Sequence, residues 1–501
     1  MSIAGTIGGL AGRLVPSGGV LERTVKSGVW AGLTNVSAQS LQYVRLLVLA
    51  ALLVPADFGL MGIALLTIAA CKQLTELGVT DALIRHEDED VGPYLDTAWV
   101  MNVVRGLVIF AFVFLAAPSI AAFFSEPRAT DVLRVVAVVP LLFGLQNPAV
   151  VYFRKDLAFH REFGLQLSRS LVDATVAIAF ALVYGTVWAL VWGVVAGELA
   201  MLLVSYAIGD YRPKLRFDWA RAREMYAFGK WITGLSILVF LTNQGDDIFV
   251  GWLLGAGALG LYQFAYHISN MPTTQVSKIV SSVAFPAYSK LQHDLPRLRE
   301  AYFRVLKLVA VVAVPTTIGI VLTIEPFVLA FLGEKWLPAV PVLQLLSVWG
   351  LVRALGSTSG SLFKARNRPD FTTKIQFGRF LLMAVLIWPA TDAYGVLGTA
   401  AVVVGTALVF SEPAVYFLVV RELGTSYRRL ATTFAVPAIA GLGMGAAVFA
   451  TGSWLSIAPA FEVAVMVAVG VVSYGVLLFA LDRATGYGVV PIVKQMASAL
   501  G

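Results

Sequence analysis

The feature that most constrains this chain is a series of long apolar runs that extends over nearly its whole length. A transmembrane helix needs ~20 mostly apolar residues to cross ~30 Å of hydrocarbon. Fourteen runs meet this requirement, with approximate limits 27–53, 57–80, 94–117, 130–151, 164–184, 187–209, 227–253, 258–284, 303–332, 338–363, 371–391, 395–420, 431–452 and 461–482. The runs predict an all-α polytopic membrane protein with fourteen transmembrane helices and no separate soluble domain.

Composition supports this fold class and excludes several functions. Charged residues make up 13% of the chain and hydrophobic residues 58%, whereas a soluble protein has about 25% charged residues. The single cysteine, Cys71, lies in an apolar run, so the chain forms no internal disulfide. The sequence has no G-x-x-x-x-G-K-S/T, G-x-S-x-G or H-E-x-x-H motif, and its four histidines are scattered. We therefore expect no metal, no cofactor, no nucleic-acid partner and no enzymatic activity.

The distribution of basic residues predicts the orientation of the helices. Cytoplasmic segments of membrane proteins are enriched in Lys and Arg. With the amino terminus in the cytoplasm, the fourteen runs leave only Arg128 and Lys335 of the 37 Lys and Arg residues in outer loops. We therefore expect a multi-pass protein of the cytoplasmic (inner) membrane with both termini in the cytoplasm.

The chain also contains a weak internal repeat. A shift of 201 residues aligns the first run with the seventh, and a shift of 210 aligns the fourth to sixth runs with the tenth to twelfth. Matched positions include Gly28 and Gly229, Trp30 and Trp231, Gly59 and Gly260, Ala64 and Ala265, Arg169 and Arg379, and Tyr184-Gly185 and Tyr394-Gly395. Because the matches keep their order over about 200 residues, chance is a poor explanation.

The repeat predicts how the helices are grouped. The shift spans six helices, an even number, so the two halves share one orientation and form a parallel repeat. We expect residues 1–210 and 211–430 to form two pseudo-symmetric six-helix lobes, followed by two helices and a cytoplasmic tail in residues 431–501. Such symmetry suits a carrier whose lobes rock about a central site, although a repeat that serves folding alone is the alternative.

One motif is similar to a nucleotide-binding loop. Gly255, Gly257 and Gly260 match G-x-G-x-x-G, which needs a preceding strand and a later acidic residue to bind a dinucleotide. Here the motif links two apolar runs, and its repeat partner at 54–59 lacks two of the three glycines. We expect a turn between two membrane helices.

Ionisable residues inside the runs are the candidate functional residues. Each costs at least about 2.5–3.5 kcal/mol near the bilayer centre, so it normally faces a cavity or a partner. Arg45 lies on the first run, and its repeat position is Asp246, so the two present opposite charges at matching depth. We expect a substrate cavity lined by Gln42, Arg45, Arg105, Asp246, Asp247, Lys278 and Arg353.

These residue types favour a large anionic substrate that carries sugar. Arginine binds phosphate through paired hydrogen bonds, and carboxylates can hold a coupling proton or sodium ion. The candidates for the coupling ion are Asp173, Glu198, Asp246 and Asp247. Each charge also has a structural alternative; Asp173, for example, can pair with Arg169 one helical turn away.

The segment from Asp246 to Gln292 resembles a known family. It reads Asp246-Asp247-Ile248-Phe249-Val250-Gly251-Trp252-Leu253-Leu254-Gly255, then Ala258-Leu259-Gly260-Leu261-Tyr262, Ala265-Tyr266, Asn270-Met271-Pro272 and Val283-Ala284-Phe285-Pro286-Ala287-Tyr288-Ser289-Lys290-Leu291-Gln292. With Phe153-Arg154-Lys155 and Phe159 after the fourth run, it resembles the Wzx-type polysaccharide flippases, in their colanic-acid-exporter-like branch. They belong to the multidrug/oligosaccharidyl-lipid/polysaccharide (MOP) exporter superfamily, and the resemblance extends from Val25 to Arg429.

The resemblance implies a fold and a function. The fold is two six-helix lobes in a V shape with two further helices. The function is to move undecaprenyl-diphosphate-linked oligosaccharide from the cytoplasmic to the periplasmic leaflet by alternating access, for export of exopolysaccharide, capsule or O-antigen. The implied partners are membrane lipids, a coupling proton or sodium ion, a polysaccharide polymerase and a co-polymerase. Arg45, Arg105, Asp246, Asp247 and Arg353 match the family in residue type and position, not through a strict motif.

Other functions stay open at this point. A multidrug cation antiporter of the same superfamily would have an acidic, aromatic pocket in place of several arginines. A lipid II flippase would share the architecture. A membrane glycan polymerase or ligase would have a large outer loop, whereas the outer loops predicted here are short.

Overall fold

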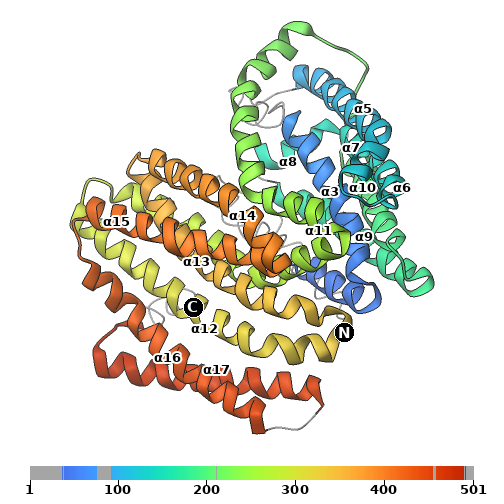
Figure 1. Ribbon diagram of the computed structural model, residues 1–501. Helices are drawn as coiled ribbons and strands as arrows, with labels where there is room; N and C mark the ends of the chain where they lie inside the picture. Colours follow the sequence, from blue (N-terminus) through green and yellow to red (C-terminus); the bar gives the residue numbers. More distant parts are fainter. Residues whose placement is uncertain are drawn as a thin grey trace, which may run out of the picture. The chain divides into compact units, whose positions relative to one another are not determined.

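The computed structural model describes residues 37, 39–75, 92–156, 158–209, 211–454, 458–489 and 491, and these residues are almost entirely helical (Figure 1). Ten helical stretches among them are long and apolar enough to cross a membrane. The helices that form these stretches are α3 (Pro55–Leu74), α5 (Gly92–Phe123), α9 (Phe159–Tyr184), α10 (Trp188–Ile208), α11 (Trp219–Lys290), α12 (Leu295–Phe331), α13 (Val340–Ala365), α14 (Pro369–Thr406), α16 (Tyr427–Trp454) and α17 (Pro459–Thr485). The chain is thus an all-α, multi-pass membrane protein, as the apolar runs predict.

Shorter elements complete the described chain. They are the apolar helix Gln39–Leu52, α6 (Ala129–Val136), α7 (Val138–Gly144), η1 (Pro148–Val150), α8 (Val151–Lys155), η2 (Glu334–Ala339), the π-helix η3 (Ala407–Ser411) and α15 (Glu412–Leu423). The predicted first and second runs extend in part outside the described residues, at 27–36 and 76–80.

Two of the long helices are interrupted by a glycine where the sequence predicts a boundary between two spans. In α11 the glycine is Gly255 (φ 81°, ψ −179°), and in α14 it is Gly395 (φ 59°, ψ −141°). Glycine reaches positive φ without the steric cost that a Cβ would add. The G-x-G-x-x-G stretch therefore contains a junction between two membrane helices, as expected.

The fourth predicted run, 130–151, is divided in the structure. The helix α6 ends at Val136, and α7 begins at Val138. Pro140 lacks the N–H that would bond to the carbonyl of Val136, so the proline explains the division at this place. A second proline, Pro148, begins the 3-10 turn η1.

The chain divides into two compact units, residues 1–260 and 261–501. In the first unit, the linker between α10 and α11 is bonded to the start of α5, because the hydroxyl of Tyr211 donates to Oδ1 of Asp96 over 2.7 Å. Burial and the neighbouring carboxylate raise the pKa of the Tyr211 phenol. The hydroxyl therefore stays protonated and can keep donating to Asp96 at neutral pH.

Within the first unit, α3 and α11 cross at two glycines that the repeat relates. A Cβ built on Gly59 would overlap the carbonyl group of Ala256, and one built on Gly260 would overlap the carbonyl group of Pro55. Because 201 residues separate the members of each equivalent pair, the contact is symmetric with respect to the repeat. The two backbones meet directly, and neither position has room for a side chain.

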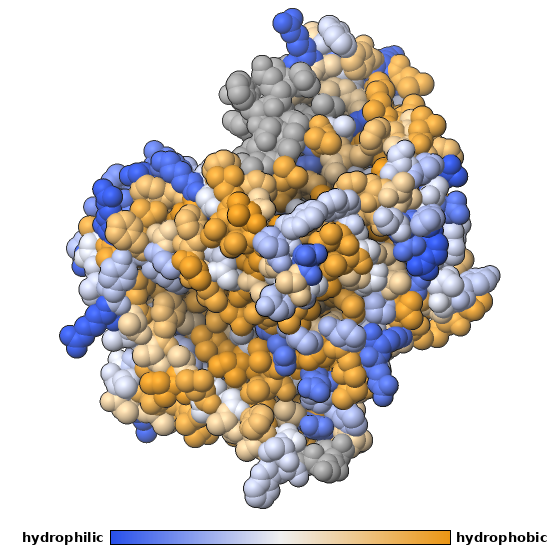
Figure 2. Space-filling model, in the orientation of Figure 1, coloured by the Kyte–Doolittle hydropathy of each residue, from blue (hydrophilic) through white to orange (hydrophobic). Residues whose placement is uncertain are grey.

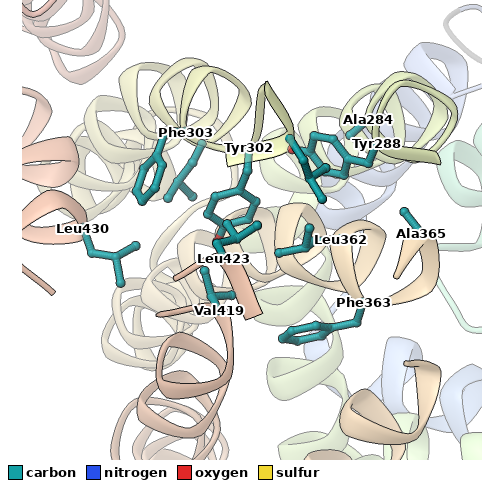
Figure 3. Close-up of a cluster of buried hydrophobic side chains, with 12 residues drawn as sticks. Ala284, Tyr288, Tyr302, Phe303, Leu362, Phe363, Ala365, Val419, Leu423 and Leu430 are labelled. Carbon is teal, nitrogen blue, oxygen red and sulfur yellow. The ribbon is translucent and has the colours of Figure 1, made fainter. Parts of the chain in front are cut away.

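The core of the second unit is built from α11, α12, α13, α15 and α16 (Figure 3). Its buried residues are Ala284, Tyr288, Leu298, Tyr302, Phe303, Leu306, Leu362, Phe363, Ala365, Val419, Leu423 and Leu430. In Figure 3 the ring of Tyr302 extends from α12 towards Val419 and Leu423 of α15. Its hydroxyl shares a 2.9 Å hydrogen bond with Ser359 Oγ, so this polar group is satisfied inside the apolar core.

The last two helices, α16 and α17, pack against each other and against α12. The hydroxyl of Tyr474 on α17 donates to the carbonyl of Val311 over 2.9 Å. On the same side, Nζ of Lys307 donates to the carbonyl of Tyr487 over 2.7 Å. Helices α16 and α17 are therefore attached to the rest of the second unit through α12.

Apolar side chains also cover the outside of the helices, as Figure 2 shows for the visible face. Leu115 is 77% exposed, Val409 78% and Trp454 89%. A soluble protein rarely exposes large contiguous apolar patches. These surfaces are therefore suited to contact with lipid chains.

Candidate functional site

The first candidate, Arg45, is held in an ion pair inside the first unit. It lies on the helix Gln39–Leu52, and its Nη2 is 3.0 Å from Oδ1 of Asp173 on α9. Both side chains are 18% exposed, whereas Gln42, three residues earlier, is exposed. The sequence pointed to Asp246 as the opposing charge, but the described contact is made by Asp173. A carboxylate within reach neutralises an arginine that would be costly alone in hydrocarbon.

A second ion pair lies next to the first. Nη2 of Arg169 on α9 is 2.9 Å from Oε1 of Glu198 on α10. Gln146, just after α7, donates to the other oxygen of Glu198 over 3.3 Å. Glu198 is 3% exposed, so both oxygens of this buried carboxylate have partners. Asp173 and Arg169 therefore each pair with a residue on another helix, and not with one another along α9.

Close packing of α10 on α9 brings these charges together. A Cβ at Gly193 would lie 2.7 Å from Oδ1 of Asp173, and a Cβ at Gly197 would lie 3.0 Å from the carbonyl oxygen of Arg169. Small residues allow membrane helices to approach closely. Asp173 interacts electrostatically with Arg45, Arg169 and Glu198, so the first unit contains a compact network of two cations and two anions.

Arg105 is bonded to the end of α3. Its Nη2 donates to the carbonyl of Lys72 over 2.6 Å, and its Nε donates to the hydroxyl of Thr75 over 3.1 Å. The last carbonyls of a helix lack partners within the helix and favour a positive charge. Arg105 also lines a cavity of about 110 Å³ with Lys72 and Phe143. Ligand pockets usually measure about 300–1,000 Å³, so in this conformation the cavity is smaller than a typical ligand pocket.

The two adjacent aspartates of α11, Asp246 and Asp247, are buried in the first unit, at 6% and 9% exposure. In the second unit, Nη1 of Arg353 on α13 donates to the hydroxyl of Tyr266 on α11 over 3.1 Å. Lys278, also on α11, is exposed. The predicted site residues thus fall in both units, and Arg45 forms an ion pair with Asp173.

The second unit contains a buried arginine that is not among the candidates chosen from the sequence. Arg379 on α14 is 7% exposed. Its Nη2 donates to the carbonyl of Val403 over 3.1 Å, its Nε lies 3.5 Å from the hydroxyl of Thr406, and its guanidinium lies 4.1 Å from the ring centre of Trp349. The repeat contained a signal for it, because Arg379 aligns with Arg169.

Comparison with known proteins places the chain in a family. The family model described as "Polysaccharide biosynthesis protein" matches residues 48–341, which is more than half of the chain. The lipopolysaccharide biosynthesis protein WzxC of Escherichia coli (strain K12) is 28% identical over 424 residues, or 83% of this chain and 85% of WzxC. The teichuronic acid biosynthesis protein TuaB of Bacillus subtilis (strain 168) is 25% identical over 408 residues, or 80% of this chain and 84% of TuaB. The succinoglycan biosynthesis transport protein ExoT of Rhizobium meliloti (strain 1021) is 25% identical over 320 residues, or 64% of each chain.

Solved structures identify the fold. The lipid II flippase MurJ, in an inward closed conformation, has a TM-score of 0.72 at 13% identity, with 90% of this chain and 98% of MurJ covered. A multidrug resistance MATE family transporter of the MOP superfamily, in an inward-facing conformation, has a TM-score of 0.62 at 13% identity, with 77% and 96% covered. The resemblance to polysaccharide flippases of this superfamily is thereby confirmed. The chain belongs to the family of polysaccharide biosynthesis proteins and has the fold of the MOP transporters.

Proposed function

We propose that this protein flips undecaprenyl-diphosphate-linked oligosaccharide from the cytoplasmic to the periplasmic leaflet, for export of exopolysaccharide, capsule or O-antigen. The observation that carries the proposal is the match to the polysaccharide biosynthesis family over residues 48–341. The relative ExoT is named a transport protein, and MurJ, which shares the fold, is named a lipid II flippase. A protein that carries the lipid-linked precursor of a polysaccharide across the membrane would account for all of these names.

The proposed arrangement is fourteen transmembrane helices in the inner membrane, with both termini in the cytoplasm. Of the ten spans found in the described residues, two are interrupted, at Gly255 and Gly395, and each of these corresponds to two helices. The helix Gln39–Leu52 and the pair α6–α7 supply the first and fourth helices. Residues 1–210 and 211–430 form the two six-helix lobes, and α16 and α17 are the last two helices.

Alternating access by two like-oriented lobes lets the polar head group cross while the polyprenyl tail stays in lipid. We assign binding of the diphosphate and sugar to the basic and polar residues of the predicted cavity. They are Arg45, Arg105, Lys278, Arg353 and Gln42. Arginine suits this role because its fork of N–H groups matches phosphate oxygens.

The pairing of Arg45 suggests how substrate and ion are exchanged. Asp173 holds Arg45 at 3.0 Å. A phosphate oxygen that replaces Asp173 keeps Arg45 neutralised and frees the carboxylate to take up a coupling proton or sodium ion. Glu198, Asp246 and Asp247 are the other carboxylates to which we assign this coupling role.

The test uses lipid vesicles that contain the full-length protein and a fluorescent undecaprenyl-diphosphate-linked disaccharide. Flipping is measured as the fraction of label that a membrane-impermeant quencher can reach. We expect Arg45→Gln to slow flipping about tenfold or more, since a hydrogen bond to a charged group contributes about 1.5–3 kcal/mol. Arg128→Gln is the control, because Arg128 lies in the α5–α6 loop and pairs with Glu126 at 2.9 Å. A wild-type protein that flips no lipid-linked glycan under a proton or a sodium gradient would contradict the proposal.

Two rival functions share the fold, so the fold does not choose between them. A lipid II flippase would restore growth to a strain that lacks that activity, and a multidrug cation antiporter would export cationic dyes. The proposal expects neither result. It expects instead that deletion of the gene removes one cell-surface polysaccharide and causes its lipid-linked precursor to accumulate.

A further inference from the structure

Glu412 is an acidic residue within a membrane span that the proposed function does not use, and its helix is irregular at this point. The π-helix Ala407–Ser411 ends directly before it, and Pro413 follows it. Within the described part of the chain this is the one π-helical segment. Such turns are rare and occur frequently at functional sites. Pro413 also has no N–H to donate to the carbonyl one turn earlier. The backbone next to Glu412 therefore lacks one of the hydrogen bonds of a regular helix.

Two tyrosine hydroxyls lie near this carboxylate. The hydroxyl of Tyr416, one turn further along α15, is close enough to interact with it. Tyr302 of α12 also interacts with it electrostatically and shares a 2.9 Å hydrogen bond with Ser359 of α13. A Cβ built on Gly356 would lie 3.6 Å from Oε1 of Glu412, so α13 passes directly beside the acid.

No basic side chain forms an ion pair with Glu412 among the residues that the structure describes. The cation that acts on it electrostatically is Arg379 of α14, and Arg379 is bonded to Val403 and packed on Trp349. On α13 the residue beside the acid, Gly356, does not titrate. An ionised carboxylate without a contacting cation is costly in hydrocarbon, whereas a neutral carboxylic acid is tolerated far better.

The hydroxyl groups suit both charge states of the acid. A tyrosine hydroxyl can donate to an ionised carboxylate, and it can equally accept from the O–H of a protonated one. In the Tyr302–Ser359 bond, either oxygen can be the donor. A tyrosine hydroxyl near the acid can therefore serve either charge state by turning about its C–O bond.

We propose that Glu412 is a proton-binding site of the second unit, which takes up one proton as a neutral acid and releases it at another stage of transport. One O–H bond forms on the carboxylate and the same bond breaks on release, so the charge of the site changes by one. The coupling to transport rests on the proposed function, whereas the binding of the proton does not. This site is separate from the four carboxylates assigned above.

Carbodiimide labelling tests proton binding without any transport measurement. Dicyclohexylcarbodiimide reacts with protonated carboxyl groups in apolar surroundings, and mass spectrometry of peptides locates the product. With full-length protein in lipid nanodiscs, we expect labelling of Glu412 that falls as the pH rises, and no labelling there in Glu412→Gln. Glu422, which pairs with Arg366 and Arg368 and has no assigned role in transport, is the internal comparison and should remain unlabelled. Labelling of Glu412 that is absent, or equal at all pH values, overturns the proposal; protection by sodium ions at constant pH would identify a sodium site and overturn it as well.

Flipping of the fluorescent undecaprenyl-diphosphate-linked disaccharide under an imposed pH gradient tests the coupling. We expect Glu412→Gln to keep downhill flipping but to lose its acceleration by the gradient. The matched control, Glu325→Gln, removes an exposed carboxylate of α12 and should respond as the wild type does. Equal melting temperatures would exclude misfolding of the glutamine variant. Absence of flipping in the wild type counts against the proposed function alone, whereas acceleration retained in Glu412→Gln counts against the coupling role of Glu412 alone.

Discussion

Two arginines related by the repeat lie in different surroundings. In the first unit, Arg169 on α9 meets the carboxylate of Glu198 on α10 at 2.9 Å. In the second unit, Nη2 of Arg379 on α14 donates to the carbonyl of Val403 over 3.1 Å, and its Nε lies 3.5 Å from the hydroxyl of Thr406. In both units a glycine precedes the acceptor residue, in Gly197-Glu198 and in Gly405-Thr406.

Both units thus place an arginine against a residue of the following helical segment, but the charge of that residue differs between the units. Each unit brings an arginine against an acceptor on the following helical segment, and this acceptor residue is an acid in the first unit, Glu198, and a threonine in the second, Thr406. In the second unit, Glu412 is an acid within a membrane span, and it forms no ion pair with a described residue. Glu198 of the first unit is therefore ion-paired, whereas Glu412 of the second unit forms no ion pair with a described residue. Such an acid can change its protonation state without breaking an ion pair.

The largest expected effect comes from removal of Glu198, the ion-paired acid of the first unit. Glu198→Leu leaves Arg169 in the membrane without its carboxylate, and loss of one partner of a buried ion pair costs about 3–5 kcal/mol. We expect a loss near the lower end, about 3 kcal/mol, because the side chain of Arg169 is 38% exposed. The measurement is the free energy of unfolding in mixed detergent micelles.

The double variant Arg169→Leu/Glu198→Leu serves as the control for this pair. It removes both charges, so we expect it to be more stable than Glu198→Leu alone. A double variant that loses the sum of the two single effects would mean that the charges do not interact. The distinction between the ion-paired Glu198 and Glu412, which forms no ion pair with a described residue, would then fail.

The second effect is steric and contrasts Gly197 with Gly405, the glycines that precede the two acceptor residues. A Cβ at Gly197 would lie 2.9 Å from the Cβ of Asp173, whereas nothing lies within 4 Å of a Cβ at Gly405. We expect Gly197→Ala to destabilise by about 1–3 kcal/mol through overpacking. Gly405→Ala should be neutral or slightly stabilising, because alanine has the higher helix propensity. Equal effects of the two alanines on the melting temperature would contradict this difference in packing.

The third effect distinguishes a charge contact from a stacked one. Lysine can still reach a carboxylate, but it cannot reproduce a planar guanidinium over an aromatic ring. Arg379 lies 4.1 Å from the ring centre of Trp349, so we expect Arg379→Lys to cost about 1–2 kcal/mol. Arg169→Lys should cost less than half as much, since Glu198 remains available. Unfolding free energies of the two lysine variants, measured side by side, decide the order; a larger loss for Arg169→Lys would reverse the assignment.

The positions of most helices could be predicted from the sequence because a long apolar run has few other ways to fold. The interruptions at Gly255 and Gly395 coincide with predicted boundaries for the same reason. The partner of Arg45 could not be predicted, because it depends on which faces of two distant helices meet. The division of the fourth run had a local signal in Pro140 that hydropathy alone does not weigh.

The candidate site was harder to predict than the fold. Arg45, Asp173 and Glu198 were recognised as charges at membrane depth, and the structure gathers them into one network. In the sequence, the only signal for Arg379 is that the repeat aligns it with Arg169. The surroundings of Glu412 depend on hydroxyls from three helices, and no spacing along the chain relates them.

The smallest expected effect tests whether the hydroxyl in the second unit replaces the carboxylate of the first. Thr406→Val keeps the shape of the side chain and removes the hydroxyl 3.5 Å from Nε of Arg379. That distance is long for a hydrogen bond, and the same hydroxyl bonds to the carbonyl of Val402 over 2.7 Å. We expect a loss of about 0.5–1 kcal/mol in unfolding free energy, well below the effect of Glu198→Leu. A loss as large as that of Glu198→Leu would mean that Thr406 is as important to its arginine as the acid is, and the two units would then differ in chemistry but not in the strength of this contact.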